Sequence, residues 1–395
     1  MSLPPFLAAP PAQAIFGALP GARAVGGAVR DHLAGLPVQD MDMAAPFPPE
    51  EIARRLAAAG FRVFETGLAH GTLTAVMART PIEVTSLRRD VVTDGRHAEV
   101  AWTTDWVEDA ARRDFTINAM SMDAAGVLHD PFGGAGDLAA RRVRFVGDPA
   151  RRLAEDYLRA LRFFRFQARY GGPMPDPAAL AAIRAAVPGL ARLSAERVWM
   201  EIKRLLAAPD PRAALALMSE AGVLAAVLPE AGDPARLDAA ISEGARDALL
   251  RVAMLLPLGT DLRHLATRLR LSGEEASRLA ALHALAQAAP AGADALALGR
   301  FAACVTARGH ATPAEVALVL AAQDPARDVA ALRALAAGPA FPLQGRDALA
   351  LGIPPGPRIG ALLAAVRDWW LAGGAVADHA ACLAQLRELA ARDAS

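Results

Sequence analysis

The sequence predicts an α+β fold in which a mixed α/β head precedes a region built only from helices. Residues 20 to about 145 mix short β-rich runs with helical stretches, and Gly and Pro bound these segments. From about residue 148 the strand signals stop, and apolar residues recur at spacings of three and four. Hydrophobic residues make up 54% of the chain and aromatic ones only 5%, so alanine and leucine supply the excess and favour helices.

The strands of the head are predicted from runs that are rich in β-branched and aromatic residues. They are "RVFET" (62–66), "GTLTAVM" (71–77), "PIEVTSLR" (81–88) and "RVRFV" (142–146). The stretch "PVQDMDMA" (37–44) alternates in the manner of a strand, with Val38, Asp40 and Asp42 on one face. Both carboxylates are therefore expected to point the same way.

The helical region is predicted from amphipathic segments that are separated by prolines. The segments are 154–170, 195–208 and 211–230, and prolines near 207–211, 229, 290, 338–342 and 354–357 mark turns. In the first segment Asp156 and Arg159 are three residues apart, so we expect them to share one helical face.

Composition limits the class of protein. The 42 basic and 42 acidic residues cancel, which taken alone argues against a nucleic-acid binder, but Arg141 to Arg204 holds 14 basic residues against 6 acidic ones. Two cysteines, Cys304 and Cys382, make no disulfide framework, so we expect no disulfide partner and a reducing compartment. No apolar run is long enough to cross a bilayer, and the N-terminus lacks the positive charges of a signal peptide. We therefore expect a cytoplasmic protein with no membrane partner.

The pair Asp40 and Asp42 has two interpretations. Two like charges this close repel each other, and divalent cations between them offset the cost. Magnesium suits the pair because it takes oxygen ligands and leaves positions for water and substrate phosphates. The alternative is a solvated edge strand, which is the more common meaning of an isolated D-x-D.

The run "AVGGAVRDHLAG" (24–35) favours the first interpretation. A short strand, then Gly26 and Gly27, then a helix from about Ala28 lets backbone N–H groups approach a phosphate closely. Arg30 in the first turn adds a charge-assisted contact. A glycine turn followed by a strand with two aspartates describes a site for a triphosphate and a metal.

The stretch "GGAVRDHLAGLPVQDMDMA" (26–44) resembles the signature of the polymerase β nucleotidyltransferase superfamily, in its class II branch of CCA-adding enzymes and bacterial poly(A) polymerases. The resemblance continues in order through six further blocks, at 65–77, 82–90, 111–123, 130–138, 142–171 and 193–206, with a weaker one at 343–363. It implies a polymerase β-like palm and four parts: a catalytic head (1–146), a helical neck that reads the base (147–206), a helical body (207–340) and a helical, RNA-binding tail (341–395).

The resemblance also implies roles for the residues of the head. Asp40 and Asp42 match the family's metal ligands for two Mg²⁺ ions, and Glu83 on a later strand is the candidate third carboxylate. Gly27 and Arg30 match the phosphate-binding turn. In "ARRDFTINAM" (111–120), Arg113 matches the arginine that contacts the phosphates or the ribose, while the aspartate and the asparagine of this block organise the junction.

The resemblance assigns the choice of base to the neck. Glu155, Asp156 and Arg159 match an E-D-x-x-R motif in which the carboxylate and the guanidinium pair with cytosine or adenine and reject guanine and uracil. Arg162 and Arg165 match further nucleotide contacts. The residues that resemble a bracing helix are Glu196, Arg197, Glu201 and Arg204.

The function that these residues imply is the template-independent addition of CCA to the tRNA 3′ end from CTP and ATP, with Mg²⁺. Enzymes that add only A, only C or a poly(A) tract share the same blocks, so they remain alternatives. A non-catalytic RNA-binding relative is a weaker alternative, because binding alone needs no pair of metal ligands.

Overall fold

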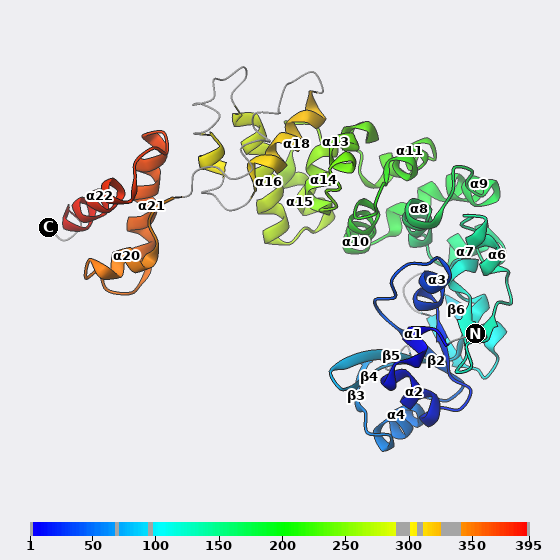
Figure 1. Cartoon of the computed structure of the whole chain (residues 1–395). Helices are drawn as coiled ribbons and strands as arrows, with labels where there is room; N and C mark the ends of the chain where they lie inside the picture. The colour runs from blue at the N-terminus through cyan, green and yellow to red at the C-terminus, as the bar shows by residue number, and fades with distance from the viewer. Residues whose placement is uncertain are drawn as a thin grey trace. The chain divides into compact units, whose positions relative to one another are not determined.

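The computed structural model describes residues 3–67, 71–93, 98–289, 301–305, 311–324 and 341–392. The chain forms two compact units, Met1–Val227 and Leu228–Ser395, which are coloured blue to green and green to red in Figure 1. The first unit holds the sheet, and the expected helical region begins within it. The finer division into head, neck, body and tail stays a prediction.

A seven-stranded sheet forms the frame of the first unit, in the order β3-β4-β5-β2-β1-β8-β9. Its strands are β1 (Arg23–Val25), β2 (Asp42–Ala45), β3 (Arg62–Gly67), β4 (Thr72–Met77), β5 (Thr80–Ser86), β8 (Ser121–Met122) and β9 (Leu128–His129). Strands β2 and β5 run parallel, and the other described neighbours run antiparallel. Strands β6 (Arg88–Thr93) and β7 (Ala98–Trp102) form a separate pair.

One face of this sheet is apolar and packs against helices α2 (Pro10–Ala18) and α4 (Pro49–Ala58). Met43 of β2 and Val84 of β5 are fully buried in this core with Ile15 and Ile52 of the two helices. Because side chains alternate along a strand, Asp42 lies on the opposite face. The polar face of the sheet is therefore available for a site.

Two of the predicted strands differ from the structure. The strand at the aspartate pair begins at Asp42, so Asp40 lies in the irregular segment before β2 rather than beside Asp42 on a strand face. The run "RVRFV" forms a single bridge between Phe145 and Phe115 instead of a strand. Val143 and Phe145 of this run are buried. The alternating apolar pattern is therefore explained by burial in the core and not by pairing within the sheet.

The predicted helix over 154–170 is also wrong at its start. Helix α7 (Pro149–Glu155) ends before Asp156, which is extended, and α8 (Leu158–Tyr170) begins two residues later. The Asp156 carboxylate accepts a hydrogen bond from Leu158 N at 3.1 Å, so this side chain caps the new helix instead of continuing the old one.

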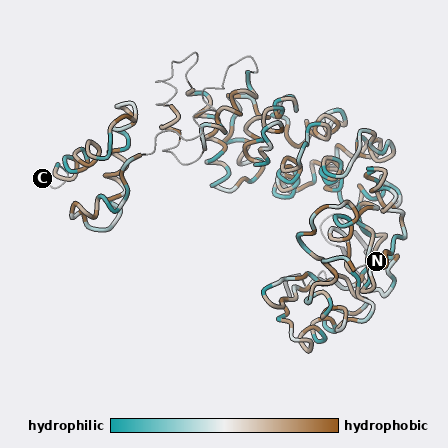
Figure 2. Tube along the Cα trace, viewed as in Figure 1, coloured by the Kyte–Doolittle hydropathy of each residue, from teal (hydrophilic) through white to brown (hydrophobic). Residues whose placement is uncertain are grey.

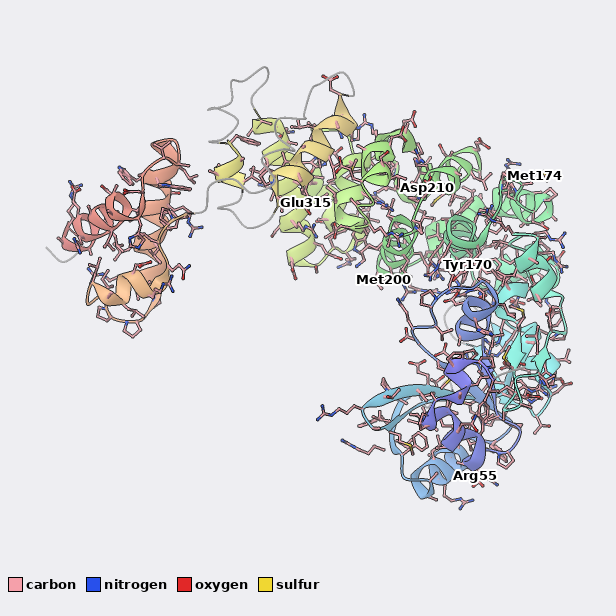
Figure 3. All side chains as sticks on the ribbon, viewed as in Figure 1. Arg55, Tyr170, Met174, Met200, Asp210 and Glu315 are labelled. Atoms are coloured by element: carbon pink, nitrogen blue, oxygen red, sulfur yellow. The ribbon has the colours of Figure 1, made fainter. Side chains whose placement is uncertain are left out.

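Helix α8 attaches the helical part of this unit to the sheet region. Phe163 and Phe166 of α8 pack on Phe115, with ring centroids 6.3 and 5.2 Å apart. At the end of α8 the Tyr170 hydroxyl donates to Asp31 of α3 at 2.6 Å, and Figure 3 labels this tyrosine. The unit's other helices are α1 (Pro5–Ala8), α3 (Gly27–Leu33), α5 (Trp106–Ala111), η2 (Thr116–Asn118), α6 (Gly134–Ala139), α9 (Pro177–Ala186), η3 (Val187–Arg192), α10 (Ala195–Leu206), α11 (Arg212–Glu220) and α12 (Val223–Val227).

In the part of it that the structure describes, the second unit is helical. Its elements are η4 (Pro234–Leu237), α13 (Asp238–Ser242), α14 (Ala248–Leu255), α15 (Leu262–Leu269), α16 (Gly273–Ala288), α18 (Pro313–Gln323), α20 (Gly345–Ala350), α21 (Pro357–Ala372) and α22 (His379–Arg392). Apolar residues, brown in Figure 2, alternate with polar ones along this part of the chain. Gln323 Nε2 donates to the carbonyls of Met254 and Leu256, which fastens α18 to the end of α14. None of the described helices is long and apolar enough to span a bilayer.

Candidate active site

A tight glycine turn forms one wall of the site. Strand β1 ends at Val25, Gly26 has φ 63° and ψ −118°, and α3 starts at Gly27. A Cβ on Gly26 would lie 3.0 Å from Arg113 Nη1, so both the backbone angle and the close approach of the guanidinium favour glycine here. The turn thereby holds Arg113 against the backbone at the start of α3.

Two carboxylates face each other across parallel strands. Asp42 of β2 is in register with Glu83 of β5, so both side chains lie on the polar face of the sheet. Burial, and then the charges of Glu83 and Asp40, raise the pKa of Asp42, while Arg113 opposes the shift. Negative charge is therefore concentrated where β2 begins, beside the middle of β5. A divalent cation would offset that charge.

Arg113 follows α5 and is held on two sides. Its Nη2 donates to Asp109 Oδ2 at 3.2 Å and its Nη1 to the carbonyl of Asn118 at 3.4 Å. Burial alone would raise the pKa of Asp109, but the charges of Arg113 and Arg112 outweigh it and hold the pKa below its usual range. Both contacts of Arg113 are long, so its guanidinium keeps donors for another acceptor.

A buried polar chain links α3 to α8. Arg30 Nη1 donates to Asn118 Oδ1 at 2.6 Å, Asn118 Nδ2 donates to Asp114 Oδ1 at 3.0 Å, and Arg162 Nε donates to Asp114 Oδ2 at 2.6 Å. Burial of Asp114 would raise its pKa, but Arg162 and Asn118 outweigh burial and lower it. The junction that the sequence predicted at the aspartate and asparagine of "RRDFTIN" is therefore present as hydrogen bonds.

Asp156 and Arg159 do not pair with each other. Asp156 Oδ2 accepts from Arg197 Nη2 at 2.6 Å, whereas Arg159 Nη1 donates to Glu155 Oε2 at 2.5 Å. The predicted shared helical face is absent because the helix breaks at Asp156. Arg197, expected only as a brace, is thus a direct partner of the carboxylate that the sequence assigned to base reading.

One cavity of about 480 Å³ gathers most of the predicted residues. Asp42 lines it, and so do all seven predicted nucleotide-binding residues. These are Gly27, Arg30, Arg113, Asp156, Arg159, Arg162 and Arg165. Asp40 and Glu83 do not line it. Seven arginines and three aspartates surround the cavity, so it suits a polyanion. Among the described residues no group of three His, Cys, Asp or Glu side chains is close enough to hold a metal ion.

The brace prediction fits the buried Glu201. This α10 residue is 3% exposed, and its carboxylate accepts from Arg165 Nε at 2.6 Å. Sequence reasoning missed two residues here. Phe166 lines the cavity, and its ring lies 4.4 Å from the Arg165 guanidinium carbon. Arg152 of α7 is 6% exposed and donates to the carbonyls of Arg112 and Arg113, for which the sequence offers only a weak i to i+3 signal with Glu155.

This fold and site define a nucleotidyltransferase with a poly(A) polymerase type of head. Residues 22–144 match the family described as the poly A polymerase head domain, and residues 175–233 match the one described as the probable RNA and SrmB-binding site of polymerase A. The chain is 38% identical over 357 residues to the mitochondrial CCA tRNA nucleotidyltransferase 1 of Danio rerio, covering 88% of this chain and 83% of the relative. The CCA-adding enzyme of Geobacillus thermodenitrificans is 40% identical over 201 residues, 50% of this chain and 48% of that one.

A solved structure agrees with these relatives. The CCA-adding enzyme of Bacillus stearothermophilus in complex with CTP superposes with a TM-score of 0.70 at 28% identity, over 98% of this chain and 99% of that one. The chain belongs to the CCA tRNA nucleotidyltransferase family. It is an enzyme of that activity, as the sequence predicted.

Proposed function

We propose that this enzyme adds C, C and A to the tRNA 3′ end by holding CTP or ATP in the 480 Å³ cavity, with Mg²⁺ at Asp42. One observation carries the proposal. The same cavity reaches from a metal-type carboxylate, Asp42, to the base-reading residues Asp156 and Arg159. The CTP and ATP analogue in the solved relatives, and the primer tRNA in one of them, support these substrates.

The triphosphate lies, on this proposal, at the glycine turn. Gly26 and Gly27 present backbone at the cavity wall without side chains in the way, and Arg30 and Arg113 supply guanidinium donors. Arginine is the preferred partner of phosphate oxygens because its donors form a rigid fork. The base then extends toward Asp156 at the other end.

The donor set fits magnesium. Asp42 and Glu83 face each other in register, with Asp40 two residues before β2, and carboxylate oxygens are the ligands that Mg²⁺ takes. Bound Mg²⁺ would make the RNA 3′-hydroxyl more acidic and neutralise the charge on the leaving pyrophosphate. In the transfer, the 3′-oxygen bonds to the α-phosphorus, the bond from that phosphorus to the bridging oxygen breaks, and pyrophosphate and one proton are released.

Base choice follows from the carboxylate of Asp156 as an acceptor and the guanidinium of Arg159 as a donor. Cytosine and adenine each offer an amino group beside a ring nitrogen acceptor, so a carboxylate can accept from one and a guanidinium can donate to the other. The side chains of Asp156 and Arg159 are already held by Arg197 and Glu155. A base must therefore compete with two ion pairs. Only a base that presents its donor to Asp156 and its acceptor to Arg159 forms hydrogen bonds that offset the loss of these ion pairs.

The test supplies purified enzyme with tRNA that lacks its 3′ end and with CTP, ATP, GTP and UTP, singly and together. Addition limited to C, C and A supports the proposal, whereas a long A tract, A alone or C alone would replace it with the corresponding alternative. Asp42→Ala should lose about a thousandfold in rate, because removing metal-dependent charge stabilisation costs several kcal/mol. Glu51→Gln, at an exposed ion pair in α4, is the control.

We propose the cytosol as the compartment. Cys304 and Cys382 are both free, which suits a reducing environment. The relatives from Danio rerio and Mus musculus are mitochondrial enzymes by name, so fractionation of cells that express the tagged chain decides between the two.

A further inference from the structure

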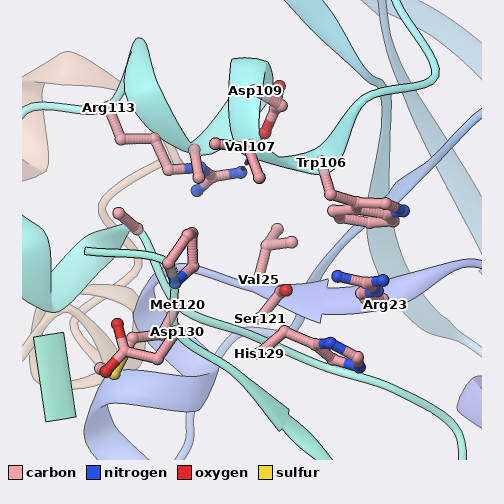
Figure 4. Close-up of a pocket in the computed structure, with 13 residues that line it drawn as sticks. Arg23, Val25, Trp106, Val107, Asp109, Arg113, Met120, Ser121, His129 and Asp130 are labelled. Atoms are coloured by element: carbon pink, nitrogen blue, oxygen red, sulfur yellow. Dashed lines mark hydrogen bonds and ion pairs between the residues drawn. The ribbon is translucent and has the colours of Figure 1, made fainter. Parts of the chain in front are cut away.

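A second cavity of about 390 Å³ lies on the same face of the sheet as Asp42. The strand registers place Glu83, Asp42, Val25, Ser121 and His129 in one row across β5, β2, β1, β8 and β9. Val25, Ser121 and His129 line this second cavity, and α5 covers it with Trp106 and Val107 (Figure 4). The second cavity therefore lies on the continuation, past β1, of the row that holds Asp42 and Glu83.

Arg113 lines both cavities. It stands at the end of the first cavity that holds the glycine turn, since its Nη1 is 3.0 Å from the position of a Cβ on Gly26. That end is where we propose the triphosphate, and the base-reading residues lie at the other end. The second cavity consequently adjoins the end from which the leaving group departs.

Arg23 supplies the second cation of this cavity. Its guanidinium carbon lies 4.3 Å from the centroid of the Trp106 ring, and Figure 4 shows the two stacked across the cavity from Arg113. Partial burial lowers the pKa of Arg23. The charge of Asp123 opposes this shift, but among the described residues no side chain or carbonyl forms a hydrogen bond or ion pair with Arg23. A cation that is partly desolvated and has no acceptor favours an anion in the adjoining space.

The carboxylates around this cavity are already engaged. Asp109 accepts from Arg112 and Arg113, and the two oxygens of Asp130 accept from the backbone of Gly134 and Ala135 at 2.7 and 2.9 Å. His129 Nε2 lies 3.0 Å from Asp123. The side-chain donors that line the cavity include those of Arg23 and Arg113 and the Ser121 hydroxyl.

We infer that this second cavity binds the pyrophosphate released by nucleotide transfer, with Arg23 and Arg113 as its partners. The inference rests on the proposed function and names the path of its product. Arg113 would contact the phosphates first in the nucleotide and then in the product, because it borders both spaces. Arg23 lines the second cavity and not the first, so a substitution of Arg23 affects the binding of pyrophosphate and not that of the nucleotide.

The test measures inhibition of CCA addition by magnesium pyrophosphate in the full chain. Arg23→Gln should raise the ratio of the pyrophosphate inhibition constant to the KM for ATP by about tenfold, since it removes a charge-assisted contact made to the product alone. Arg62→Gln is the control, because Arg62 of β3 is a second strand arginine next to an aromatic ring, that of Phe64 at 5.4 Å, and it lines neither cavity. The control should keep the wild-type ratio.

Equilibrium dialysis of magnesium pyrophosphate against the same proteins, without RNA, gives a second readout. Arg23→Lys, which keeps the charge and loses the fork, should fall between wild type and Arg23→Gln, and it serves if the glutamine variant does not fold. A wild-type ratio in either folded variant would overturn the inference while leaving CCA addition intact. Wild-type protein that adds no nucleotide at all would instead refute the proposed function.

Discussion

Asp156, to which the proposed function assigns base choice, already has two partners in the structure without a nucleotide. Its two carboxylate oxygens serve different tasks: one caps α8 at Leu158 N, and the other accepts from Arg197. Because the capping oxygen is fixed by the backbone, the second oxygen is the one that a base can reach by displacing Arg197. The same side chain thus shapes the helix start and, on the proposed function, offers an acceptor to the base.

Replacing Asp156 with asparagine should relax the choice of base. The amide keeps an oxygen for the cap but turns the outward group into a donor, which suits the carbonyls of guanine and uracil. We expect the kcat/KM of GTP relative to ATP to rise by at least tenfold, or about 1.4 kcal/mol. Single-nucleotide incorporation with each of the four nucleotides measures it. Glu51→Gln is the control, and full rejection of GTP and UTP by Asp156→Asn would contradict this assignment.

At the scale of elements, α7 connects Arg113 and Arg159, which both line the cavity. Arg152 of α7 donates to the carbonyls of Arg112 and Arg113, directly after α5, and also pairs with Glu155, which in turn binds Arg159. One buried guanidinium therefore connects Arg113 and Arg159, to which the proposed function assigns phosphate contact and base reading. We regard Arg152 as a positioning residue because it does not line the cavity.

Arg152→Lys should lower kcat more than it raises KM. A lysine keeps the charge but cannot serve two carbonyls and a carboxylate with one rigid fork. We expect kcat to fall by about a hundredfold, because small misplacements of groups around a reacting centre cost that much. Steady-state kinetics with CTP and ATP check this, alongside thermal melting. If melting alone changed and kcat did not, the residue would be structural only.

A second element, α6, is tied to the loop at η2 by a buried carboxylate. Asp137 is 1% exposed and accepts from Thr116, Arg142 and Arg144. Burial would raise the pKa of Asp137, but these hydrogen bonds outweigh it and lower the pKa. A carboxylate with a lowered folded pKa adds stability above its unfolded pKa of about 3.9, and this stability is lost as the pH falls through the folded value.

Asp137→Asn should therefore cost about 2 kcal/mol at neutral pH. The gap in melting temperature between wild type and variant should stay constant down to about pH 5 and shrink below about pH 4. Thermal melting between pH 7 and pH 3 measures it, with Glu388→Gln at an exposed pair in α22 as control. If the gap in melting temperature widened on acidification, the pKa of Asp137 would not be lowered in the folded state.

Periodicity predicted most elements of the site but not the way its side chains pair. The strands at 62–66, 71–77 and 81–88 form as β3, β4 and β5, because alternation and β-branched residues report sheet burial directly. The break at Asp156 escaped prediction, since apolar spacing continues across it and a capping aspartate looks like any helix-surface acid. Arg197 and Arg152 escaped as partners because both depend on contacts 40 or so residues away, which no local pattern carries.

At the scale of the whole molecule, the predicted chemistry is confined to one unit. Every residue that lines the 480 Å³ cavity falls between Gly26 and Arg197, inside the unit that ends at Val227. The match to the probable RNA-binding site of polymerase A runs to residue 233, just past that boundary. The helices of the second unit have a core of their own, with Trp370 and Val366 buried in α21. The residues that line this cavity and the buried core of the second unit thus lie in separate stretches of the chain.

A fragment of residues 1–227 should fold and bind nucleotides while losing its hold on tRNA. It is a compact unit of the chain, and it carries Asp42, the glycine turn, Asp156 and Arg159. We expect its Kd for CTP and ATP to lie within about threefold of the full chain, since independent sites are additive to a few tenths of a kcal/mol. The KM for tRNA should rise at least tenfold, because the helices that follow no longer contribute contacts to the RNA. Calorimetric titration and incorporation assays on both proteins measure the two quantities. If the fragment unfolded cooperatively but bound no nucleotide, part of the site would have to come from beyond residue 227, against the assignment made for this cavity.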